Sequence, residues 1–174
     1  MKSLITIQKT FKVFKTLSMI AMVISFIAAG TALLGLLCVI EWQSEGMLGF
    51  GRSIMEFTGT RSLEPAICAL LSDVVFALTD GILFLFAWNY FKAEQEDSTP
   101  FTHSGADKVR SLGIKTIVMP IVAVIISSVI YQCFRVEPAL EWSNDVSVVL
   151  GIVLILASMV FRYGAELEAT SSQN

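Results

Sequence analysis

Long apolar runs separated by short polar segments dominate the pattern of the chain. Four runs stand out, at about residues 17–40, 66–91, 113–134 and 146–163. A bilayer core about 30 Å thick takes about 20 apolar residues of α-helix, because each residue adds about 1.5 Å. Lipid offers no hydrogen-bond partner to an open backbone, so the spans must be helical. The pattern predicts an all-α, integral membrane four-helix bundle that forms a single membrane domain over residues 1–174.

The composition supports a membrane protein and disfavours several other classes. Hydrophobic residues make up 55 % of the chain and charged residues 16 %, whereas a soluble domain carries about 25 % charged residues. The mean hydropathy is +0.72. A disordered chain and an ordinary soluble enzyme are therefore both disfavoured. The net charge of −3 gives no sign of a nucleic-acid-binding surface, so we expect no direct nucleic-acid partner.

Lysine and arginine are distributed unevenly between the predicted sides of the bilayer. Nine of the twelve lie in the N-terminal arm, around the second connection or at the end of the fourth run: Lys2, Lys9, Lys12, Lys15, Lys92, Lys108, Arg110, Lys115 and Arg162. The first and third connections hold Arg52, Arg61 and Arg135. Basic residues favour the cytoplasmic side. We therefore expect both termini and the second connection in the cytoplasm.

Two carboxylates interrupt the second apolar run. Asp73 and Asp80 lie seven residues apart and so share one face of a helix. Asp80 falls near mid-membrane, where a carboxylate costs about 2.5–3.5 kcal/mol on insertion scales. One interpretation is an ion or proton path. The other is structural, with neutral carboxyl groups hydrogen-bonded to Ser72, Thr79 or hydroxyls on other spans.

Small residues recur along the first run at steps of three and four: Ser18, Ala21, Ser25, Ala28, Ala32 and Gly35. Such a stripe lets a neighbouring backbone approach closely. We favour contact with another span of the same chain, and a homodimer interface is the alternative.

Residues with catalytic or metal-binding chemistry are scarce. Cys38, Cys68 and Cys133 all fall near the outer ends of their spans, where a disulfide between two of them is chemically feasible. The chain has no Cys-x-x-Cys, which disfavours a thiol oxidoreductase, and we favour a packing role for the three cysteines. His103 is the single histidine, which excludes a histidine-cluster metal site. We expect no catalytic residues, no metal and no cofactor, and so a protein that is not an enzyme.

The second connection contains a segment with helical character. A short helix is predicted from near Thr102 or Ser104, because Ser104 followed by Asp107 resembles a capping arrangement. Val109 and Leu112 would then face the membrane surface, while Lys108 and Arg110 face lipid headgroups or a partner. The alternative is an ordinary interfacial linker.

Two motifs carry a family resemblance. Residues 99–102 (Thr-Pro-Phe-Thr), followed by residues 109–113 (Val-Arg-Ser-Leu-Gly), form one motif, and residues 160–167 (Val-Phe-Arg-Tyr-Gly-Ala-Glu-Leu) form the other. In both motifs and in the order of its spans, the chain resembles the bacterial family catalogued as domain of unknown function 2975. The resemblance implies a four-span protein of the bacterial inner membrane. Members are often encoded beside a small helix-turn-helix regulator, which implies a membrane partner that restrains or signals to a transcription factor.

The leading functional hypothesis is a regulatory or sensing membrane protein that binds a cytoplasmic partner. The docking candidates are the motif residues Pro100, Phe101, Arg110, Arg162 and Glu166. The rival hypothesis is a small transporter or channel subunit that uses Asp73 and Asp80.

Overall fold

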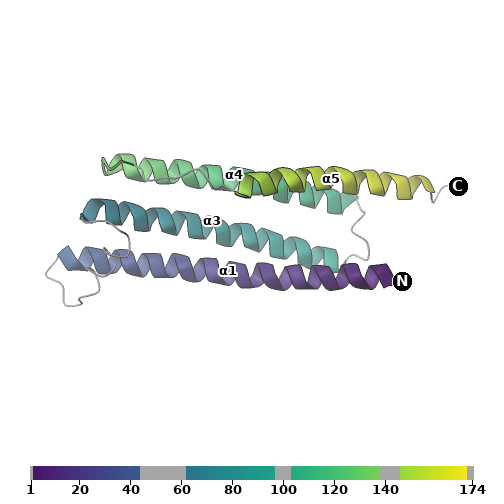
Figure 1. The fold of residues 1–174 in the computed structure, drawn as a ribbon, viewed down its shortest axis with the longest axis horizontal. Coiled ribbons are helices and arrows are strands. Elements are labelled where there is room, and N and C mark those ends of the chain that lie inside the picture. The colour runs from purple at the N-terminus through teal and green to yellow at the C-terminus, as the bar shows by residue number, and fades with distance from the viewer. Residues whose placement is uncertain (1, 44–61, 97–102, 138–145, 172–174) are drawn as a thin grey trace. The chain divides into compact units, whose positions relative to one another are not determined.

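The computed structural model describes residues 2–43, 62–96, 103–137 and 146–171, and every regular element in these ranges is an α-helix (Figure 1). The helices are α1 (Lys2–Gln43), α3 (Leu63–Glu96), α4 (His103–Cys133) and α5 (Val146–Ser171). The all-α prediction is confirmed. Each helix contains one stretch long and apolar enough to cross a membrane, and these stretches are Lys9–Ile40, Leu63–Glu94, Ser104–Cys133 and Val148–Glu166.

The helices extend beyond the apolar runs that predicted them. α1 begins at Lys2 rather than near residue 17, and α3 continues to Glu96. Hydropathy marks only the part of a helix that suits lipid, whereas hydrogen bonding along the backbone continues into polar sequence. Each helix therefore extends beyond its predicted span at one end or at both, whereas the end of α4 at Cys133 and the start of α5 at Val146 agree with the prediction to within one residue.

The predicted helix start near Thr102 or Ser104 is confirmed, but the prediction that this helix is short is wrong. α4 begins at His103 and continues without a break through Pro120 to Cys133. Val109 is 3 % exposed and Leu112 is 8 % exposed, so both pack inside the protein rather than against the membrane surface. The apolar spacing of this segment reflects helix packing.

The chain divides into two compact units. Unit 1 comprises Met1–Met22, Ile82–Met119 and Ser143–Asn174, and unit 2 comprises Val23–Gly81 and Pro120–Trp142. All nine basic residues that are predicted from the sequence to lie on the cytoplasmic side belong to unit 1. Among the described residues of unit 2, Arg135 is the single basic residue.

Unit 2 has a small core between α1 and α3. Val39 and Ala66 are fully buried and form a cluster with Leu70, against which Leu36, Leu63 and Ile67 pack. On another face of α3, the Tyr131 phenol of α4 lies close to Ser72 and Cys68. Within unit 2, α3 therefore contacts both α1 and α4.

Unit 1 is held by aromatic contacts and by a close approach of two helices. Phe14 of α1 stacks on Phe91 of α3, with ring centroids 5.5 Å apart. Gly113 of α4 and Gly151 of α5 face each other so closely that an ideal Cβ on Gly151 would lie 2.9 Å from the Gly113 carbonyl oxygen. That same Cβ would also collide with the side chain of Ile117. Only glycine lets α4 and α5 pack at this distance.

The outward faces of the helices are apolar. Only 17–28 % of the most apolar window of each candidate span is buried inside the protein. Large aliphatic side chains such as Ile24, Ile27, Leu34 and Val160 are 60–65 % exposed. An apolar surface of this extent is unfavourable in water and suits a lipid environment.

Replacing Gly151 with alanine tests the helix contact. We expect Gly151→Ala to lower the free energy of unfolding by about 1–3 kcal/mol, because the added methyl group overpacks the contact with Ile117 and Gly113. Gly30→Ala is the matched control, since no atom beyond its own turns of helix lies within 4 Å of a Cβ built there. The measurement is denaturant unfolding of the detergent-solubilised chain. Equal stability of the two variants would contradict the contact.

Candidate functional site

Asp73 and Asp80 line one open groove in unit 2. The groove has a volume of about 660 Å³ and lies between α1 and α3. Its walls are Ala28, Thr31, Ala32, Leu34, Gly35 and Cys38 from α1, and Leu70, Asp73, Phe76, Ala77 and Asp80 from α3. Both carboxylates are exposed in a surface that is otherwise mostly apolar. The structure thus brings together the two intramembrane candidates that the sequence singles out.

The hydroxyl groups near the carboxylates differ in their surroundings. The Thr79 hydroxyl donates to the carbonyl oxygen of Val75 at 2.8 Å, and the Thr31 hydroxyl donates to that of Ala28 at 2.8 Å. Ser72 is buried and faces the Tyr131 phenol of α4, although its oxygen makes no hydrogen bond of good geometry within the described residues. Of the two hydroxyls proposed as donors to the carboxylates, one therefore donates within its own helix and the other lies against α4.

The small residues of α1 form part of the same groove. Ala28, Ala32 and Gly35 line it opposite Ala77 and Asp73 of α3. Nearby, an ideal Cβ on Gly81 would lie 3.1 Å from the Phe26 ring, so α1 and α3 also approach closely here. This geometry favours contact between spans of one chain as the role of the stripe.

A second cleft brings two docking candidates together in unit 1. Arg110 of α4 and Arg162 of α5 line a cleft of about 140 Å³ together with Ala106, Asp107, Ser158 and Met159. The Arg162 Nε atom lies 3.7 Å from Glu166 Oε1, one turn further along α5, and both side chains are 58 % exposed. Pro100 and Phe101, the other two candidates, lie outside the described residues.

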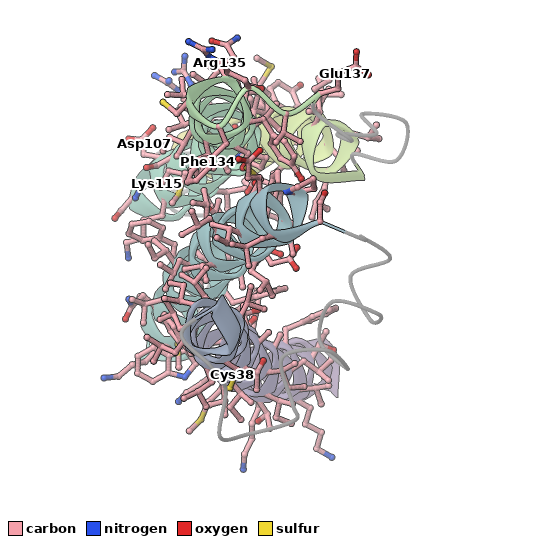
Figure 2. All side chains as sticks on the ribbon, turned by 90° about the vertical axis from the view of Figure 1, so that its left-hand side faces the viewer. Cys38, Asp107, Lys115, Phe134, Arg135 and Glu137 are labelled. Atoms are coloured by element: carbon pink, nitrogen blue, oxygen red, sulfur yellow. The ribbon has the colours of Figure 1, made fainter. Side chains whose placement is uncertain are left out.

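A third cleft was not anticipated from the sequence. It has a volume of about 750 Å³ and lies between α3 and α4 of unit 1, lined by Phe86, Asn89, Tyr90, Ala93, Ser104, Asp107, Lys108, Ser111, Leu112 and Lys115. The Lys115 ammonium sits 3.8 Å from the centre of the Phe86 ring. Figure 2 shows Asp107 and Lys115 on the same side of α4. The signal in the sequence was the helical spacing of Ser104, Lys108, Ser111 and Lys115.

The three cysteines are free thiols with different surroundings. Cys68 is buried, Cys38 is half-buried in the groove wall, and Cys133 is exposed. Within the described ranges, no group of three or more histidine, cysteine, aspartate and glutamate side chains is arranged to hold a metal ion.

Comparisons of the chain with models of protein families, with curated proteins and with solved structures give no match.

Proposed function

We propose that the chain is a non-enzymatic, multi-pass protein of a bacterial inner membrane that regulates or senses through a cytoplasmic partner. Both termini lie on the cytoplasmic side in this proposal. The four long apolar helices and their exposed aliphatic faces support the membrane location. The gathering of nine basic residues in unit 1 supports the orientation, because lysine and arginine flank the cytoplasmic ends of spans.

The convergence of Arg110 and Arg162 carries the docking proposal. The two residues are 52 positions apart in the sequence and belong to different helices, yet they line one cleft. Their guanidinium groups present planar arrays of N–H donors that suit a carboxylate of a partner protein. Asp107 and Glu166 lie beside them, so the surface carries both signs of charge and can fix the register of a partner.

The partner that we propose is a small cytoplasmic regulator of the helix-turn-helix type. The motivation is the resemblance of the two sequence motifs to the family described above, and both motifs contribute an arginine to this cleft. In this arrangement the membrane protein contacts the regulator and not the nucleic acid.

Removing the two arginines tests the docking surface. We expect Arg110→Ala/Arg162→Ala to lower recovery of a co-purifying cytoplasmic regulator by about five- to thirtyfold, because each exposed ion pair contributes up to about 1 kcal/mol. Arg135→Gln, which changes an exposed arginine beyond the other end of α4, is the control. Recovery is measured by quantitative mass spectrometry of detergent extracts. Equal recovery with the wild type and the double variant would overturn the proposal.

The groove that holds Asp73 and Asp80 favours a second candidate function. Two carboxylates on an open, otherwise mostly apolar wall offer a binding site to a cation or a proton. The chain would then be a small transporter or a channel subunit, with these two residues in the path of the ion.

Neutralising the carboxylates tests the second candidate. If the groove conducts, Asp80→Asn abolishes cation or proton flux in proteoliposomes and Asp73→Asn reduces it, because the amide cannot carry the charge or the proton. Asp107→Asn is the control, since Asp107 lines clefts in unit 1 and not this groove. Flux is followed with a pH-sensitive or cation-sensitive dye. If proteoliposomes with the wild-type chain show no flux above that of protein-free vesicles, the carboxylates have a structural role.

A further inference from the structure

The cleft between α3 and α4 in unit 1 has the lining of a polar ligand site. One stripe of α4, formed by Ser104, Lys108, Ser111 and Lys115, faces one stripe of α3, formed by Phe86, Asn89, Tyr90 and Ala93. The steps of four, three and four residues along α4 place its two amines and two hydroxyls on one face. A volume of about 750 Å³ is within the range of sites that bind small molecules.

The two lysines lie at the depth of a phospholipid headgroup if α4 crosses the bilayer. Residues 116–133 contain no charged side chain, and as a helix they extend about 27 Å, close to the thickness of the hydrocarbon core. Lys115 therefore marks the edge of the hydrocarbon. Lys108 lies about 10 Å further out along the axis, beyond most of the headgroup layer. The phosphate level falls between the two amines.

The charge of the lining fits a phosphodiester. Lys108 and Lys115 contribute two positive charges and Asp107 one negative charge. Glu94 lies one turn beyond Tyr90 but is 2 % exposed and is not part of the lining. The net charge of the residues that line the cleft is therefore +1, which matches the single negative charge of a phosphodiester. Asn89, Ser104 and Ser111 add hydrogen-bonding groups for a hydroxylated headgroup.

The Phe86 ring positions one of the two amines. The Lys115 ammonium lies 3.8 Å from the ring centre, where the negative face of the ring attracts it. This contact holds the flexible lysine in the cleft and leaves N–H donors on the side away from the ring. The amine is thereby placed to meet an anion from the headgroup layer.

We propose that this cleft binds the phosphodiester headgroup of an anionic phospholipid, with Lys108 and Lys115 on the phosphate. Basic pockets between spans at the cytoplasmic side are typical sites for such headgroups. The inference rests on the membrane location proposed above but does not depend on the cytoplasmic partner. A soluble phosphate ester has the same recognition chemistry, so the test must separate the two sources.

Lipid binding by the full chain tests the proposal. The chain is purified in mild detergent, depleted of lipid and titrated with phosphatidylglycerol or phosphatidylcholine, and bound lipid is counted by native mass spectrometry. We expect phosphatidylglycerol to bind more tightly than phosphatidylcholine. Removing either lysine, in Lys108→Gln or Lys115→Gln, weakens phosphatidylglycerol binding about fivefold, and removing both weakens it about 25-fold.

The matched control is Lys92→Gln. Lys92 belongs to the same unit and also lies over an aromatic ring, that of Trp88, at 5.5 Å, but it is not part of the cleft lining. We expect this variant to bind phosphatidylglycerol as the wild type does. Thermal unfolding of each variant shows whether a loss of lipid binding comes from loss of the fold. If Lys115→Gln unfolds, the binding of phosphatidylglycerol by Lys108→Gln tests the proposal instead.

Three results would overturn the proposal. The first is equal binding of phosphatidylglycerol by the wild type and the double variant. The second is equal affinity for phosphatidylglycerol and phosphatidylcholine. The third is displacement of the lipid by millimolar glycerol 3-phosphate or inorganic phosphate, which would assign the cleft to a soluble phosphate instead. Each result leaves the docking proposal for Arg110 and Arg162 unaffected, because neither lines this cleft.

Discussion

Hydrocarbon offers no hydrogen bonds, and this constraint explains most features of the chain. Helices satisfy the backbone internally, and several hydroxyl groups do the same by donating to a carbonyl one turn earlier. Thr116 donates to the Leu112 carbonyl at 2.9 Å, and Ser128 donates to that of Val124 at 2.9 Å. With the backbone and these hydroxyl groups paired inside each helix, the outward faces can be aliphatic. Packing within the units then depends on small residues, such as Gly113 and Gly151, which allow close approach.

The same constraint makes the remaining charges informative. Charges are expensive in lipid, and nine of the twelve basic residues belong to unit 1. Asp73 and Asp80 instead interrupt an apolar stretch of α3, and both line one groove. The three clefts therefore differ in chemistry. The groove of unit 2 carries carboxylates, one cleft of unit 1 carries two arginines, and the other carries two lysines beside aromatic and amide side chains.

The sequence was sufficient for the features that depend on hydropathy and on spacing within one helix. It predicted four apolar helices, and it placed Asp73 and Asp80 on one face. It predicted a helix that starts near Ser104, but it missed that this helix continues unbroken from His103 into the third span, because the low hydropathy between His103 and Leu112 hides the continuing helical hydrogen bonding. It also missed the α3–α4 cleft. To predict a site formed by two helices, one must know which faces of the two helices meet. The spacing of residues along a single helix does not give this information.

Topology mapping in a bacterial inner membrane tests most directly whether the chain crosses the bilayer four times with both ends inside. A fluorescent protein fused to the C-terminus matures only in the cytoplasm, and alkaline phosphatase becomes active only outside it. We predict a fluorescent C-terminal fusion, and an active phosphatase when the enzyme is inserted in the segment between α1 and α3. Phosphatase activity at either terminus, or fluorescence from an insertion between α1 and α3, would contradict the four-span arrangement.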